Sequence, residues 1–316
     1  MPPLPYGEHD IFRGYAEGDD ALVSRLVAAN LEPHPGVYTD QIGVRVDPRY
    51  CPWVWDKANQ IGSGLPLPSD GYIGDGMEYV ALALALEWAH GQDSFVVAEL
   101  GAGWGPWVSA AALCAKRQGF SRTEILALEA DRPRFEVLRQ HLALNGLVPG
   151  DSANVGSTDS IAWRLIQGAV GLEDGVLYWP KSDDVTAAGR SAVSDLNKPH
   201  HFTGEDIAFE EVKAFSLDTI LAEISRVDLL HVDIQGSEGS ILPAAIDLLN
   251  TKVRSMFVGT HSRKIEGDFI DFFRSHGWVL TREKPCQFYS MLHGQDLTSS
   301  TYVDGGQFWR NNKLFG

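Results

Sequence analysis

A glycine-rich turn is the first segment of this sequence whose composition suits the binding of a small ligand. Residues 96–100 form an apolar run with Glu99 near its end, and this run leads into Gly-Ala-Gly-Trp-Gly at 101–105 and then Pro106. Glycine permits a tight turn and a close approach of the backbone to a ligand. Proline is favoured in the first turn of a helix. The pattern therefore predicts a strand, a ligand-binding turn and a helix.

Two neighbouring residues narrow the type of ligand. Pro106 stands where the third glycine of a dinucleotide-binding GxGxxG pattern would lie, which disfavours a pyrophosphate ligand. Glu129 ends the next predicted strand, 24 residues beyond Gly105. A carboxylate at that position can accept both hydroxyl groups of an adenosine ribose. We therefore expect Glu129 to bind the ribose, and Glu99 to lie near the amino-acid end of such a cofactor.

Asp233 and His261 are the candidates for a catalytic step. Each follows an apolar run that predicts a strand, and ligands of a doubly wound sheet bind outside the carboxyl ends of its strands. We therefore expect both side chains at the same edge as Gly101 and Glu129. A hydroxyl group that attacks an electrophile must lose its proton, and a histidine with a pKa near neutrality can accept it.

A divalent cation such as Mg²⁺ is the alternative way to activate a hydroxyl group. His231, Asp233, Glu238 and His261 are the candidate metal ligands, and coordination would lower the pKa of the hydroxyl directly. His231 and Asp233 are two residues apart, so they share one face only if the strand is regular. The residues alone leave the base and the metal open.

Alternating apolar runs and helical patterns must position these residues. Helices at 77–90, 106–118 and 132–145 surround strands at Phe95–Leu100 and Glu124–Glu129, which is a βαβ arrangement. Further strands are expected at Ile161–Val170, Val176–Trp179, Glu210–Phe215, Asp228–Asp233 and Arg254–Gly259. Further helices are expected at Leu217–Ile224, Glu238–Leu249 and Asp268–His276. The order predicts an α/β fold with a doubly wound, parallel core sheet and helices on both faces.

The chain divides into an N-terminal extension and one large domain. Residues 1–75 contain a predicted helix at 20–30 and a stretch rich in proline and glycine at 47–76, which could form a cap over a cleft. Residues 76–316 hold the predicted sheet. The polar stretch 180–208 has no periodicity and is interpreted as an insertion between strands.

Composition excludes several classes of partner. The chain has 316 residues and a formal charge of −16, whereas nucleic-acid binding depends on clustered Lys and Arg. No apolar stretch is long enough to span a bilayer. The three cysteines, Cys51, Cys114 and Cys286, form no CxxC pair, which is typical of a reducing compartment. We expect a cytoplasmic protein with no nucleic-acid or membrane partner.

The ordered motifs of residues 76–278 resemble the FkbM family of methyltransferases. The first motif is Glu99–Gly103, and the second combines 128–133 (Leu-Glu-Ala-Asp-Arg-Pro) with 142–146 (Leu-Ala-Leu-Asn-Gly). Residues 169–175 resemble the third segment. Residues 216–219 and 227–238 resemble the segments around the fourth strand. Each motif is modest alone, but their order and spacing are specific.

Two positions depart from the family pattern. Where the family commonly has Lys-Ile-Asp-Val-Glu-Gly-Ala-Glu, residues 231–238 are His-Val-Asp-Ile-Gln-Gly-Ser-Glu. A lysine is thus replaced by His231 and an acid by Gln235. The loss of the acid slightly favours a metal-free base over a cation at this edge.

The resemblance implies a Rossmann-like fold that uses S-adenosylmethionine to methylate a hydroxyl group of a sugar or another small product. The alternatives are a nicotinamide-dependent oxidoreductase and a non-catalytic module with the nucleotide-binding fold. The expected cofactor-binding residues are Glu78, Glu99, Gly101, Ala102, Gly103, Glu129, Ala130, Ala169, Val170 and Asp233.

Overall fold

The computed structural model describes residues 16–62, 74–186, 189–196, 207–288 and 301–315, together with Gly14 and Leu67. Parts of two predicted segments therefore lie outside the described residues. These parts are 63–66 and 68–73 of the predicted loop, and 187–188 and 197–206 of the predicted insertion.

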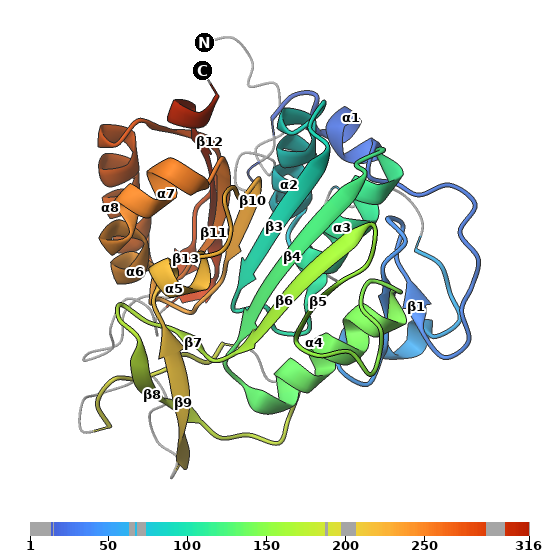
Figure 1. The fold of residues 1–316 in the computed structure, drawn as a ribbon, viewed down its shortest axis with the longest axis horizontal. Helices are drawn as coiled ribbons and strands as arrows, with labels where there is room; N and C mark the ends of the chain where they lie inside the picture. The colour runs from blue at the N-terminus through green and yellow to red at the C-terminus, as the bar shows by residue number, and fades with distance from the viewer. Residues whose placement is uncertain are drawn as a thin grey trace.

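A sheet of eight strands organises the molecule, in the order β12-β15-β11-β10-β3-β4-β6-β5 (Figure 1). Its five central strands are parallel. They are β11 (Ser255–Thr260), β10 (Leu229–Val232), β3 (Ser94–Leu100), β4 (Arg122–Glu129) and β6 (Ile161–Gln167). The direction of chain progression reverses between β3 and β10, which is where doubly wound sheets bind ligands. The predicted fold class is confirmed.

Antiparallel strands complete both edges of this sheet. β15 (Gly305–Asn311) pairs with β11, and β12 (Trp278–Lys284) pairs with β15. β5 (Val155–Ser157) pairs with β6 at the opposite edge. The sequence pattern predicts no strand after Gly259, so the C-terminal pair is an addition to the expected sheet.

Helices cover both faces of the sheet, each over a separate apolar core. One face carries α2 (Gly76–Trp88), α3 (Pro106–Arg117) and α4 (Arg132–Leu144). The other face carries α5 (Leu217–Ile220), α6 (Glu238–Ala244), α7 (Ile246–Lys252) and α8 (Arg263–Ser275). The predicted helix 238–249 is two helices that meet at Ala245, where the backbone leaves the helical conformation (φ −100°, ψ 19°). The predicted helix Leu217–Ile224 is shorter and ends at Ile220.

A small sheet of three strands lies beyond the carboxyl ends of the central strands, in the order β7-β9-β8 (Figure 1). It consists of β7 (Ala169–Val170), β8 (Gly175–Pro180) and β9 (Phe209–Phe215). The predicted strand Ile161–Val170 is therefore wrong as a single strand. It breaks at Gly168, where a Cβ atom would overlap the side chain of Phe215 and a backbone carbonyl, and Ala169 then joins the small sheet.

The N-terminal segment packs onto the face that carries α2, α3 and α4. It contains α1 (Asp19–Ser24), β1 (Tyr38–Thr39), β2 (Arg45–Val46) and the 3₁₀ helix η2 (Pro52–Lys57). The predicted helix 20–30 thus ends at Ser24. Apolar side chains of this segment, such as Leu26 and Ile42, belong to the same buried cluster as α2 and α3.

Three short elements complete the described chain. They are β13 (Gln287–Phe288), β14 (Thr301–Val303) and the 3₁₀ helix η3 (Asn312–Leu314). Among the described residues, no helix has the length and apolar character needed to cross a membrane.

Candidate active site

The glycine turn predicted from the sequence connects β3 to α3. Gly101, Gly103 and Gly105 all have positive φ, and the amides of Gly101 and Ala102 donate to the carbonyl oxygen of Leu128 at 3.0 and 2.9 Å. A Cβ atom at Gly101 would overlap the carbonyl oxygen of Asp233, which directly follows the neighbouring strand β10. The first glycine is therefore required by the close packing of β3 against β10, independently of any ligand.

Glu99 holds the start of α3. Its carboxylate accepts hydrogen bonds from the backbone amides of Trp107 at 3.3 Å and Val108 at 2.8 Å. These amides have no partner within the helix, and the positive end of the helix dipole favours an acid there. Glu99 is only 2% exposed, and this burial raises its pKa to about 7. The residue thus has a structural function besides any contact with a ligand.

Glu129 closes the turn from the adjacent strand. Its two carboxylate oxygens accept hydrogen bonds from the amides of Gly103 at 2.6 Å and Asp131 at 2.8 Å. Burial raises the pKa of Glu129, and the charge of Arg134 opposes this shift. The predicted ribose-binding acid is therefore fixed in position by backbone donors on both sides.

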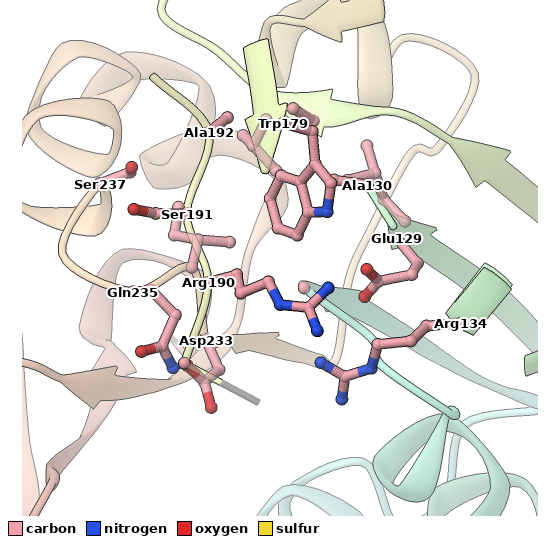
Figure 2. Close-up of a pocket in the computed structure, with 16 residues that line it drawn as sticks. Glu129, Ala130, Arg134, Trp179, Arg190, Ser191, Ala192, Asp233, Gln235 and Ser237 are labelled. Carbon is pink, nitrogen blue, oxygen red and sulfur yellow. The ribbon is translucent and has the colours of Figure 1, made fainter. Parts of the chain in front are cut away.

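A first cavity, of about 100 Å³, lies beside Glu129 (Figure 2). Its walls combine the predicted cofactor residues Gly101, Glu129, Ala130, Ala169, Val170 and Asp233 with residues that the sequence analysis did not select. The latter include Arg134, Trp179, Arg190 and Gln235. The side chains of Trp179, on β8, and Arg190, in the segment after β8, point into this cavity from outside the main sheet (Figure 2).

A second cavity, of about 390 Å³, lies on the other side of the glycine turn. It shares Gly101, Arg134 and Asp233 with the first cavity. The remaining walls are aromatic and acidic, and include Asp75, Glu78, Glu99, Trp104, Trp107, His231, Phe257, His261 and Asp304. Asp233 thus stands at the boundary between the two cavities, with a side chain that is 45% exposed.

Three of the predicted residues form a series of charged side chains at the end of β10 and β11. Glu238 accepts from His261 Nδ1 at 2.9 Å, and Asp233 Oδ1 lies 3.3 Å from His261 Nε2. Gln235 also donates to Asp233, at 2.9 Å. Glu238 and His261 are buried, whereas Asp233 faces the cavities.

The charges in this series differ from the sequence expectation of a near-neutral histidine. Burial alone would lower the pKa of His261, but hydrogen bonds to Asp233 and Glu238 raise it to about 11. Burial alone would raise the pKa of Asp233, but the hydrogen bond to His261 and the charge of His231 lower it. At neutral pH the structure therefore holds an imidazolium between two carboxylates.

His231 has a separate partner on α2. Its Nε2 lies 2.9 Å from Glu78 Oε1, and its ring is stacked between Trp107 and Phe257. Burial lowers the pKa of His231, but the hydrogen bond and charge of Glu78 outweigh it, so the net shift is upward. The predicted cofactor residue Glu78 is thus engaged with a predicted metal ligand.

The four predicted metal ligands are therefore divided between two clusters. His261 lies against Asp233 and Glu238, whereas His231 lies against Glu78. In the part of the chain that the structure describes, no group of three or more His, Cys, Asp or Glu side chains has an arrangement that could hold a metal ion.

The cavity residues that sequence analysis missed come from distant parts of the chain. Asp304 and Gly305 lie at the start of β15, and Arg190 belongs to the predicted insertion. Neither segment has a hydrophobic periodicity from which its position at the carboxyl ends of the central strands could be predicted. Trp104 and Trp107 are within and just after the glycine turn, so their proximity to it was the available signal.

Comparison with known proteins identifies a family and a sequence relative. Residues 95–280 match the family described as the methyltransferase FkbM domain. A proposed methyltransferase of Jannaschia sp. (strain CCS1) is 30% identical over 258 residues, which cover 79% of this chain and 85% of the relative.

Solved structures of methyltransferases are similar at low sequence identity. A precorrin-6Y C5,15-methyltransferase from Geobacter metallireducens GS-15 is 12% identical, with a TM-score of 0.36, over 72% of this chain and 86% of that one. The C-terminal domain of the corresponding protein from Rhodobacter capsulatus is 13% identical, with a TM-score of 0.38, over 76% of this chain and 91% of that one.

Proposed function

Because this chain belongs to the FkbM methyltransferase family, we propose that it transfers a methyl group from S-adenosylmethionine to a hydroxyl group of a saccharide or another small polar acceptor. The observation that carries this proposal is the position of Asp233 between two cavities of different character. The residues that line the first cavity are of the types that bind a nucleoside, and those that line the second are suited to a polar acceptor.

The residues of the first cavity fit the adenosine end of the cofactor. Glu129 ends β4 with its carboxylate at the cavity wall, where it can accept hydrogen bonds from ribose hydroxyl groups. Ala130, Ala169 and Val170 are nearly buried and provide an apolar surface for a purine. The turn Gly101–Gly103 lies between this cavity and the second, so it would run along the middle of the cofactor.

The second cavity fits the cofactor's amino-acid end and the acceptor. Glu78 and Glu99 are carboxylates that can bind an ammonium group, and they line the side of the cavity formed by α2 and β3. Asp233, His261 and Asp304 line the side formed by β10, β11 and β15. Carboxylates combined with aromatic rings are suited to an acceptor with hydroxyl groups and apolar C–H faces.

The cofactor supplies an electrophilic methyl group on a sulfonium. Of the three residues Asp233, His261 and Glu238, only Asp233 has an exposed side chain, and its carboxylate is ionised. Asp233 can therefore accept the proton of the acceptor hydroxyl as the hydroxyl oxygen attacks the methyl group. His261 is protonated, and its Nε2 lies 3.3 Å from Asp233 Oδ1, so the two side chains form an ion pair. In this proposal Asp233 is catalytic, and His261 fixes its orientation and charge.

Glu238 holds His261 from the opposite side. It is fully buried and accepts a hydrogen bond from the amide of Gly236 at 2.7 Å as well as one from His261. Both carboxylate oxygens are thereby used inside the protein. Glu238 is therefore a positioning residue for the imidazolium.

Calorimetry and product analysis test the proposal together. We expect the protein to bind S-adenosylhomocysteine and to bind NAD far more weakly, because the turn lacks the dinucleotide pattern. Mass spectrometry of saccharides and other polyols incubated with S-adenosylmethionine should then detect a methylated product. Asp233→Asn should lower the turnover of that acceptor by about 100-fold or more. Preferential binding of NAD, or full turnover by the Asn variant, would contradict the proposal.

A further inference from the structure

A segment of the predicted insertion forms one wall of the first cavity. We call residues 189–193 the strap. Tyr178 on β8 and Val193 at the end of the strap exchange two backbone hydrogen bonds of 2.9 Å. Four strap residues, 189–192, line the cavity opposite Glu129 and Ala130 (Figure 2). The strap is therefore attached to β8 and crosses the cavity from outside the main sheet.

Asp131 connects the strap to the main sheet. Its Oδ1 accepts from the amide of Arg134, which is the N-cap interaction of α4. Its Oδ2 accepts from Arg190 Nη1 at 2.9 Å and from Trp179 Nε1 at 3.2 Å. The side chains of Arg190 and Asp131 are 10% and 3% exposed. A buried ion pair of this kind is weakly screened by salt, and separating it leaves two charges without their partner.

The side chain of Arg190 lies in the space that a nucleoside would need. Its guanidinium is located between Glu129 and Asp233, below the indole of Trp179 in the view of Figure 2. With Arg190 there, the cavity has only about 100 Å³, whereas ligand pockets usually measure about 300–1,000 Å³. Arg190 must therefore leave this position before a purine nucleoside can enter.

We propose that the Arg190–Asp131 ion pair is an autoinhibitory contact that competes with the adenosine end of the cofactor. This inference rests on the proposed function, because it assumes that the first cavity binds adenosine. A protein whose binding-competent state is only partly populated has an apparent affinity reduced by that fraction. Breaking the ion pair in advance should therefore increase the affinity for the cofactor.

Substitution on either side of the ion pair tests this competition. Arg190→Ala should tighten the binding of S-adenosylhomocysteine by about tenfold, chiefly through faster association, because a hydrogen bond to a charged group no longer has to be broken. Asp131→Asn should act in the same direction. Asparagine is as good an N-cap as aspartate, so the start of α4 is preserved while the charge that holds Arg190 is lost.

A double-mutant cycle makes the test specific. Because the two substitutions break the same contact, the double variant should bind no tighter than either single variant. Arg122→Ala is the matched control, since Arg122 begins β4 at the end opposite the cavity and pairs only loosely with Glu124, at 3.8 Å. Its binding rates should equal those of the wild type. Surface plasmon resonance gives the association and dissociation rates.

The outcomes separate this inference from the proposed function. Weaker or unchanged binding by Arg190→Ala, with an intact thermal unfolding transition and tight binding by the wild type, would overturn the competition and leave the proposed function in place. Weaker binding would assign Arg190 to cofactor contact instead. Failure of the wild type to bind S-adenosylhomocysteine at all would overturn both.

Discussion

At the scale of single residues, the buried acids of this site serve the fold as well as the proposed chemistry. Glu99 accepts hydrogen bonds from two backbone amides of α3, and Glu129 accepts them from the glycine turn and from the N-cap residue of α4. Glu238 accepts one from a backbone amide and one from His261. Asp233 differs because its side chain is nearly half-exposed and reaches both cavities. This difference in exposure is why we assign the proton-accepting role to Asp233.

Glu129→Gln tests the ribose contact. We expect the affinity for S-adenosylhomocysteine to fall by about 1–3 kcal/mol, because a charge-assisted acceptor is lost while the amide oxygen can still accept one backbone hydrogen bond. Isothermal titration calorimetry measures this change. Glu124→Gln is the control, since Glu124 is on the same strand and is exposed to solvent. Wild-type affinity in Glu129→Gln would remove this residue from the site.

The pH dependence of kcat/KM distinguishes Asp233 from His261 as the base. Asp233 has a lowered pKa and is ionised above it, and His261 stays protonated up to about pH 11. If Asp233 accepts the proton, activity should be lost only as the pH falls through its lowered pKa. Activity that rises as the pH approaches about 11 would instead assign the base to His261.

Other titrating groups near Asp233 can also change the pH profile of kcat/KM. His231 and Asp304 also face this edge, and Glu99 has a pKa of about 7. The profile should therefore be recorded for the wild type and for Glu99→Gln. A change near pH 7 that disappears in the variant belongs to Glu99 and leaves the assignment of Asp233 unaffected.

At the scale of elements, the junction of β3 and α3 should make stability depend on pH. The unfolded chain loses the Glu99 proton near pH 4.5, whereas the folded protein keeps it until about pH 7. Between these values the folded state binds more protons at Glu99, so the contribution of this group to the free energy of unfolding falls as pH rises and levels off above pH 7. The upper limit of this loss is about 3 kcal/mol.

Glu99→Gln should remove this slope. Chemical denaturation of the wild type and the variant on both sides of pH 7 gives the difference in free energy of unfolding. The variant should gain relative to the wild type as the pH rises, because glutamine cannot ionise. A constant difference across the range would mean that the Glu99 carboxyl titrates normally.

The elements that were predicted from sequence are those with strong local patterns. The strand at 94–100, the helix at 106–117 and the strand at 122–129 have apolar runs and helix-starting residues, and their predicted bounds agree within two residues. The C-terminal strands were missed for local reasons. β12 is mostly half-buried and has only a weak apolar alternation, and β15 begins with two glycines, which are disfavoured in strands.

The candidate site was predictable only where a motif marks it. Glu129 and Asp233 follow apolar strands, so their location at the carboxyl edge follows from the topology. Arg190 is held at the first cavity by its ion pair with Asp131, which is distant in sequence. Asp304 is brought to the second cavity by the pairing of β11 with β15. The carboxylate partners of His261 also depend on tertiary structure, which is why its raised pKa was not expected.

At the scale of the whole molecule, an aromatic cluster of Tyr50, His141 and Trp104 connects the N-terminal segment with α4 and the glycine turn. Tyr50 Oη lies 2.8 Å from His141 Nδ1 on α4, and both side chains are buried. The rings of Tyr50 and His141 also contact Trp104, which lines the second cavity. Burial lowers the pKa of His141 to about 3, so its imidazole is neutral and the phenol hydroxyl can donate to Nδ1.

Tyr50→Phe therefore tests whether residues 1–75 unfold with the rest of the chain. The substitution keeps the ring but leaves His141 Nδ1 without its donor, which should lower the free energy of unfolding by about 1–3 kcal/mol. Apolar side chains from both sides of residue 75 share one buried cluster, so a single cooperative transition should move to lower denaturant concentration with an unchanged slope. Tyr302→Phe is the control, because Tyr302 is 63% exposed. Two separate transitions, with only one of them shifted by Tyr50→Phe, would instead establish the N-terminal segment as an independent folding unit.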